Sequence, residues 1–384
     1  MSVAARWERR VQLGAHPLAY PLVRGIGRIA PVVRVPRVGV VVSDAVLARE
    51  VLTDTEGFTK TGPGSPADLW TPVVGPSVLL NMEGADHTRL RRTLSGLFTP
   101  RFVDRLCMRV AAEPMAALRT RLAAGRCVDL VPVVRDLAGA VICELVGLRT
   151  DRAGFTRAFE ATTAVTSMVR LGRSRLTPAQ VARGRAELSV LTEPAAEAFA
   201  HGDPESVPGR MRELGLSERE ALGAVAAFVL TGTETLVSYL PRLVALTHDT
   251  GWLPRLVDEP ERIDDVVSEA LRFTVPSPVM LRSVAAERTL ATVRVRSGDR
   301  VVIATISAAK GLGAFDPDRP HPPAVQRLWF GAGPHFCLGM PLASAEIRTV
   351  LDTLLDAGPV VVVDREVARR VLIPAYRRLV VRRV

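Results

Sequence analysis

Apolar residues follow a helical spacing through the middle of the chain, whereas short β-branched segments lie toward its two ends. The helical pattern is almost unbroken from residue 85 to about residue 200. Strand-like segments lie at residues 32–43, 289–295, 300–304, 360–363 and 378–381. The pattern lacks the regular alternation of strand and helix that a parallel sheet requires. It predicts a mainly α protein with a smaller β region assembled from both ends of the chain.

We expect a single domain over residues 1–384. Its β-rich parts are predicted near residues 32–60 and 285–305 and over residues 360–384, and its helical core over residues 85–273 and 340–356. No internal repeat or Ser/Gly linker divides the chain into halves.

One helix is predicted to pass through the middle of the protein. Ser217 and Glu220 form a capping-box pattern at its start, and the segment that follows, ALGAVAAFVL, is apolar on nearly every side. Farther along, Gly232 lies among several hydroxyl residues, a combination that weakens a helix. We predict a local widening of the helix at Gly232 and a second break at Pro241.

Composition narrows the class of protein. The chain has 384 residues, of which 48% are hydrophobic, and this fraction indicates a folded core rather than disorder. Its longest apolar run, residues 221–230, is too short for a membrane span, and its N-terminus lacks a secretion signal, so we expect a cytoplasmic protein. The formal net charge is +10, but the cations are scattered without a basic stripe, and we therefore expect no nucleic-acid partner.

The residues with the most specific chemistry are the decapeptide 330–339, FGAGPHFCLG, which precedes an amphipathic helix pattern. Cys337 lies at the end of this glycine-rich loop and at the start of the helix. Free amides and the positive end of the helix dipole favour a thiolate at such a position. A thiolate stabilised in this way is a suitable iron ligand. The other three cysteines form no CxxC pair, which argues against a zinc site or a disulfide framework.

This decapeptide resembles the haem-binding signature of the cytochrome P450 family, Phe-Gly-x-Gly-x-His-x-Cys-x-Gly, and fills all its fixed positions. The resemblance implies the cytochrome P450 fold and a bound haem b (iron protoporphyrin IX). By resemblance, Cys337 is the axial thiolate ligand of the iron, Phe330 packs beside the sulfur, and His335 reaches a haem propionate. Gly331 and Gly339 belong to the same cofactor-binding loop.

Three further motifs occur in the order typical of the family. Glu269 and Arg272 match its Glu-x-x-Arg pair, which is expected to be buried and structural. The arginine that normally completes this network has no clear place, and Arg319 and Arg327 are rival candidates.

Three basic residues resemble the family's propionate-binding residues. His87 and Arg91 are four residues apart, so both can face one anionic group from a single helix face, and Arg282 follows the Glu-x-x-Arg helix. Without the resemblance, the segment at residues 86–92 also fits a basic surface helix.

The segment Thr231–Thr235 on the central helix resembles the family's Ala/Gly-Gly-x-Asp/Glu-Thr motif. Glu234 takes the acid position and Thr235 the hydroxyl position, and Gly232 lies beside the cofactor. In the family's chemistry the hydroxyl holds a water and the carboxylate relays protons. Leu236 stands where a second hydroxyl is frequent.

The resemblance implies a soluble, bacterial-type, monomeric monooxygenase. It would use O₂ to oxidise a mid-sized apolar substrate, with electrons from a separate ferredoxin and ferredoxin reductase, because the chain carries no dinucleotide-binding or iron-sulfur motif. Oxidative coupling, desaturation and peroxide-driven oxidation are alternatives, and a non-catalytic haem-binding protein is a rival of another class. By position, the substrate pocket is expected to include Trp70, Val73, Phe228, Thr231, Val279 and Met280.

Overall fold

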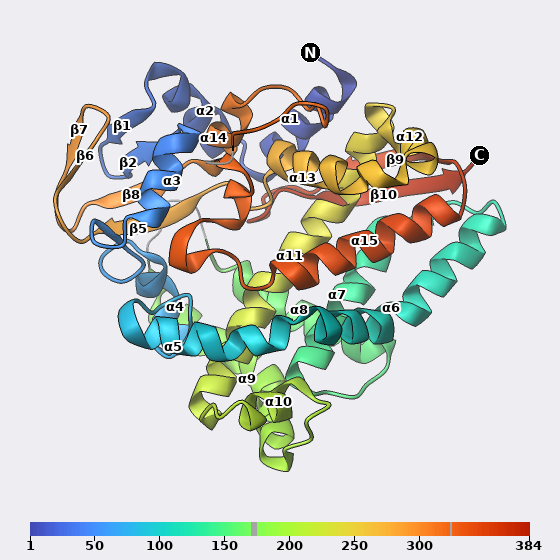
Figure 1. Cartoon of the computed structure of the whole chain (residues 1–384), viewed down its shortest axis with the longest axis horizontal. Coiled ribbons are helices and arrows are strands. Elements are labelled where there is room, and N and C mark those ends of the chain that lie inside the picture. The colour runs from blue at the N-terminus through green and yellow to red at the C-terminus, as the bar shows by residue number, and fades with distance from the viewer. Residues whose placement is uncertain (170–174, 323–324) are drawn as a thin grey trace.

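A computed structural model describes residues 1–169, 175–322 and 325–384 of the chain (Figure 1). Helices make up most of it, as the sequence predicts. The α-helices are α1 (Val3–Ala15), α2 (Ala19–Ile29), α3 (Ala45–Thr53), α4 (Pro66–Val74), α5 (Gly84–Leu94), α6 (Pro100–Ala123), α7 (Leu130–Val146), α8 (Arg152–Thr166), α9 (Pro178–His201), α10 (Val207–Glu213), α11 (Glu218–Asp249), α12 (Trp252–Asp258), α13 (Ile263–Thr274), α14 (Thr305–Gly311) and α15 (Met340–Asp356).

The strands form three small sheets. They are β1 (Val32–Val35), β2 (Gly39–Val42), β3 (Phe58–Thr59), β4 (Val128–Asp129), β5 (Met280–Val284), β6 (Arg288–Leu290), β7 (Val293–Val295), β8 (Arg300–Ile303), β9 (Val360–Val367) and β10 (Tyr376–Arg383). The largest sheet has the order β1-β2-β8-β5-β3, and β2 and β8 run parallel within it. Strands from both ends of the chain therefore lie side by side, as the sequence pattern predicts. The three-stranded sheet, β4-β10-β9, joins the C-terminus to the start of α7.

The N-terminal helices α1 and α2 and the short strand β5 are additions to the sequence-based prediction. The segment around Met280 and Arg282 was expected only as the stretch after a helix, but it pairs with β8 across residues 280–283. This pairing fixes the side on which each of its side chains lies, because neighbouring residues of a strand point to opposite faces.

Helix α11 runs through the middle of the molecule, as Figure 1 shows. Its start has the predicted capping box, in which Glu220 Oε2 accepts from the Ser217 amide at 3.0 Å. By length and hydropathy this helix could cross a membrane, but 67% of its most apolar window is buried inside the protein, against α7, α13 and α15 among others. It is the core helix of this fold.

The predicted interruptions of the central helix do not occur. Helix α11 is one continuous α-helix that passes both Gly232 and Pro241. The backbone around Gly232 accepts side-chain hydrogen bonds within the helix, since Thr235 Oγ1 lies 3.3 Å from the carbonyls of both Thr231 and Gly232. Burial of the helix on nearly all sides outweighs the weak helix propensity of these residues.

A buried ion pair links α1 to the central helix. Arg242 Nη2 lies 2.5 Å from Glu8 Oε1, and the two side chains are only 1% and 6% exposed. The remaining donors of Arg242 reach the backbone carbonyls of Thr274 and Pro374 and the hydroxyl of Ser238. One guanidinium therefore holds together the N-terminal helix, the end of α13 and the turn between β9 and β10.

We expect Arg242→Met to lower the free energy of unfolding by about 3–5 kcal/mol, because it leaves the Glu8 carboxylate buried and unpaired. Urea denaturation of the purified protein measures this change. Arg378→Met is the matched control: Arg378 and Asp364 form a half-exposed pair at 2.9 Å, worth at most about 1 kcal/mol. If the two variants were equally stable, the Glu8–Arg242 pair would not be the main link to α1.

Candidate functional site

The loop that carries Cys337 has a backbone conformation that only glycine readily adopts. Gly331 and Gly333 have φ values of 82° and 64°, and a Cβ on Gly333 would lie 2.9 Å from the carbonyl oxygen of Leu52. A hydrogen bond of 2.9 Å from the Cys337 amide to the Phe330 carbonyl closes the loop. The loop thus delivers Cys337 to a fixed point directly before α15.

Cys337 is a free cysteine with an exposed side chain, although protein atoms surround much of its thiol. Burial raises the pKa of this thiol, while the amides of Gly339 and Met340 and the nearby cations of Arg91 and Lys60 oppose the rise. The sequence suggested a lowered pKa at this helix start, but desolvation outweighs the amides here. A metal cation at the sulfur would lower the pKa of the thiol despite its burial, because the cation stabilises the thiolate directly.

Basic side chains from distant segments converge beside Cys337. His87 and Arg91 come from α5, and Arg91 Nη2 donates to the Phe336 carbonyl at 2.6 Å. The His87 ring is 2% exposed, lies 4.2 Å from the His335 ring, and its Nε2 atom has no hydrogen-bond partner in the described structure. Arg282, on β5, is 5% exposed and donates to its neighbour's carbonyl at Leu281. The structure therefore brings together all the basic residues that sequence reasoning proposed for this site.

Two residues of this cluster were missed by sequence reasoning. Glu83 Oε2 lies 2.7 Å from His335 Nε2, and Glu83 Oε1 accepts from the Lys60 amide at 2.5 Å. The His335 hydrogen bond and the Lys60 amide lower the pKa of Glu83 to about 2 despite its burial. A signal was available for Lys60, because only Lys60 and Lys310 among 50 basic residues are lysines.

On α11, Thr231 and Gly232 are exposed although their helix is central and mostly buried. A Cβ built on Gly232 would meet no atom within 4 Å, so open space lies on this face of the helix. Thr235 follows one turn after Thr231 and is also partly exposed. The three residues border this open space, which we call the hollow.

Glu234 reaches a different partner from Thr235. Its carboxylate accepts a hydrogen bond from Thr166 Oγ1 on α8, and burial raises its pKa. It also lines a cavity of about 260 Å³ bounded by Arg135, Thr163 and the turn between β9 and β10. Adjacent helix residues are rotated by about 100°, and the acid and the hydroxyl therefore meet different surroundings.

The six residues predicted for a substrate pocket belong to different packing clusters, and a pocket shared by them stays a prediction. Val73 packs with Val165 and Leu230, and Trp70 lies against the same cluster. Phe228 instead packs edge-to-face on Phe98, with ring centroids 5.3 Å apart. Its neighbours in a separate small apolar space include Leu97 and Leu342.

The other members of the predicted pocket lie on other elements. Met280 begins β5 in the large sheet, where it pairs with Ile303, and Val279 directly precedes it. Thr231 is exposed on α11, as described above.

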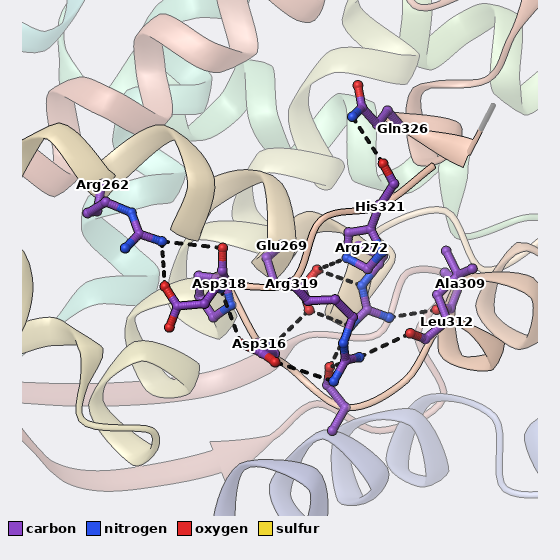
Figure 2. Close-up of polar contacts among 12 residues, drawn as sticks. Arg262, Glu269, Arg272, Ala309, Leu312, Asp316, Asp318, Arg319, His321 and Gln326 are labelled. Atoms are coloured by element: carbon purple, nitrogen blue, oxygen red, sulfur yellow. Dashed lines mark hydrogen bonds and ion pairs between the residues drawn. The ribbon is translucent and has the colours of Figure 1, made fainter. Parts of the chain in front are cut away.

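Glu269 and Arg272 form the predicted buried pair on α13 (Figure 2). Two parallel contacts join them, Nε to Oε2 at 2.6 Å and Nη2 to Oε1 at 2.5 Å. Arg272 also donates to the carbonyls of Ala309 and Ala314. All three nitrogens of this fully buried guanidinium therefore have hydrogen-bond partners.

His321 completes the Glu269 network, rather than Arg319 or Arg327. His321 Nε2 lies 2.8 Å from Glu269 Oε2, while Arg319 bonds to the carbonyls of Leu312 and Ala314 and to Asp316 (Figure 2). Arg327 contributes a left-handed backbone, φ 57°, at the start of the turn before the loop. The family pattern predicts an arginine at this point of the network, and a histidine is therefore not expected from the sequence.

Comparisons with known proteins agree on one family. A family model described as Cytochrome P450 matches residues 261–358. The chain is 32% identical over 308 residues to mycinamicin IV hydroxylase/epoxidase of Micromonospora griseorubida, covering 73% of this chain and 72% of the relative. It is 29% identical to cytochrome P-450 monooxygenase DoxA of Streptomyces peucetius subsp. caesius, covering 83% and 81%.

A solved structure also resembles the chain throughout. It is that of a mutant of P450 EryK in complex with erythromycin B, with a TM-score of 0.80 and 25% identity, covering 95% of this chain and 96% of that one.

We expect His321→Leu to destabilise the protein by about 1–3 kcal/mol, because it removes the donor to a buried carboxylate oxygen. The urea midpoint of the purified variant measures this effect. Arg327→Met is the control, and its exposed side chain predicts a change within about 0.5 kcal/mol. A larger loss for Arg327→Met than for His321→Leu would contradict the assignment of His321.

Proposed function

The chain belongs to the cytochrome P450 family, and we propose that it is a monooxygenase that inserts one oxygen atom from O₂ into a C–H bond of a mid-sized, largely apolar substrate. The family's cofactor is a haem with a cysteine thiolate as axial ligand, and its members are oxidoreductases that act on small molecules with O₂ and redox partners. The observation that carries the proposal is the position of Cys337, a free and exposed thiol directly before α15 and beside a cluster of basic side chains.

The residues around the hollow fit a haem. The flat group needs space without side chains, and Gly232 offers such space on α11. Its iron needs an anionic ligand, for which Cys337 has two backbone amides directed at its sulfur. Its propionates need donors, and the orphaned Nε2 of buried His87 lies close to Arg91 and Arg282. We therefore assign Cys337 as the iron ligand and His87, Arg91 and Arg282 as propionate-binding residues.

The bound haem supplies the oxidation chemistry, and the protein supplies ligand charge, protons and orientation. In the proposed mechanism, the Thr235 hydroxyl holds a water on the open face of α11. The Glu234 carboxylate, with its raised pKa, takes a proton from the side of the 260 Å³ cavity and returns it toward that water. A carboxylate with a raised pKa suits this role, because it exchanges protons closer to neutral pH.

The proposed substrate site is bounded by Trp70 and Val73 on α4, Thr231 on α11, and Val279 and Met280 at the start of β5. These side chains are mainly apolar, which supports an apolar ligand. The relatives include a hydroxylase/epoxidase and a protein solved in complex with erythromycin B. We therefore propose a bacterial secondary metabolite of similar size as the substrate. Phe228, one turn before Gly232 on the same face of α11, packs on Phe98, and we assign it a supporting role beside the predicted pocket.

We also propose that the protein is a cytoplasmic monomer that receives electrons from a separate ferredoxin and its reductase. The net charge of +10 supports an acidic electron donor, because complementary charge accelerates association.

Cys337→Ser should abolish the red-shifted absorption band that a haem-thiolate protein shows after reduction and exposure to carbon monoxide. Cys127→Ser is the matched control, because Cys127 is also a free, exposed cysteine but lies in the turn before β4. Absorption spectra of both purified variants and of the parent protein test the ligand assignment. Persistence of the band in Cys337→Ser would refute it.

Thr235→Ala should divert reducing equivalents into peroxide, because the hydroxyl that holds the water is lost. The measurement is the ratio of product formed, or peroxide released, to NAD(P)H consumed with ferredoxin and reductase. Thr235→Ser keeps the hydroxyl and should retain most of the coupling. Equal coupling in the alanine and serine variants would mean that another group organises the water.

A further inference from the structure

Lys60 stands out within the basic cluster because this chain otherwise uses arginine almost throughout. Strand β3 pairs with β5 in antiparallel register, with Phe58 opposite Val284 and Thr59 opposite Ser283. Continuing this register by one residue places Lys60 opposite Arg282. Like charges directly opposite one another on a sheet are destabilising, so this pairing calls for an anion nearby.

Glu83 is the acidic group beside this pair, but both of its carboxylate oxygens already have hydrogen-bond partners. Oε1 accepts from the Lys60 amide, and Oε2 bonds to His335 Nε2. Thus Glu83 holds the backbone of Lys60, and it occupies the ring nitrogen through which His335 would reach an anionic ligand. The Lys60 ammonium has no hydrogen-bond acceptor among the described residues.

The charge of the cluster can be compared with the charge of the two haem carboxylates. Apart from the two histidines, the cluster contains three cations, Lys60, Arg91 and Arg282, and one carboxylate, Glu83. Its net charge of two positive units matches the two carboxylates of a haem. Without Lys60, the net charge of the cluster would fall to one positive unit, which is too little to balance both carboxylates.

We propose that Lys60 binds a haem propionate in this protein. It would take the role that the family motif gives to His335, whose ring is bonded to Glu83 instead. This inference rests on the proposed function, since it assumes that haem occupies the hollow. Burial and the charge of Arg282 lower the pKa of Lys60 to about 7 in the protein alone. A carboxylate beside the ammonium would raise that pKa again, because an opposite charge favours the charged form.

The first test is the rate at which haem leaves the ferric protein and passes to excess apomyoglobin. We expect Lys60→Met to accelerate this loss about 10- to 100-fold, because it removes a charge-assisted hydrogen bond. Lys60→Arg keeps the charge and should restore at least part of the retention. Lys310→Met is the matched control, since Lys310 is the other lysine of the chain and lies against Tyr20 and Phe273. It should lose haem at the parent rate.

A double variant separates charge balance from a merely structural role of Lys60. Glu83→Gln removes the anion that Lys60 offsets, so Lys60→Met should accelerate haem loss less in the Glu83→Gln background than in the parent. Equal acceleration in both backgrounds, or haem loss from Lys60→Met within twofold of the parent, would overturn the proposal. Such results would leave the P450 assignment intact, whereas a parent protein that binds no haem would refute the proposed function itself.

Chemical labelling gives a second readout that does not depend on turnover. Acetylation of the haem-free protein at pH 7.5, followed by peptide mass spectrometry, should modify both lysines. Bound haem should protect Lys60 and leave the labelling of Lys310 unchanged. Equal labelling of Lys60 with and without haem would contradict its contact with a propionate.

Discussion

The buried ion pair between Glu269 and Arg272 is the interaction on which the position of the site depends. Removing two charges from water is costly unless every donor and acceptor finds a partner. Here the partners are supplied by the segment 309–321, through two carbonyls, the Asp316 amide and the His321 ring. That segment leads into the loop that ends at Cys337. The need to satisfy one buried pair therefore fixes the path of the chain toward the thiol.

A second constraint is the open space beside Gly232 on α11, where an added Cβ would meet no atom within 4 Å. Protein interiors are close-packed, so open space beside a central helix must be kept open by the surrounding structure. Apart from Glu218 and Arg219 at the start of α11, only Thr231 and Gly232 of this helix are exposed. The unbroken geometry of this helix turns Glu234 and Thr235 in different directions, so the carboxylate and the hydroxyl meet different surroundings.

The sequence predicted the parts of this site that are local in the chain. The signature around Cys337, the i, i+4 spacing of His87 and Arg91, and the capping box at Ser217 are short patterns whose chemistry can be recognised without the fold. The contacts that were missed or misassigned join distant segments. Glu8 and Arg242 lie 234 residues apart, and Glu83 and His335 lie 252 apart. No periodicity or spacing rule connects such pairs, because each forms only when the whole chain has folded.

The Glu83–His335 contact shows how far a motif can fix a role. The signature fixes where His335 stands, but the partner of its ring is chosen by an acidic residue from another segment. Because a neutral imidazole has one donor and one acceptor nitrogen, the Glu83 carboxylate on Nε2 leaves only Nδ1 of His335 for another partner. A family motif thus specifies a backbone and a side chain, whereas the charge around it is set by residues outside the motif. In this chain the same Glu83 carboxylate also accepts from the amide of Lys60, the one lysine of the cluster.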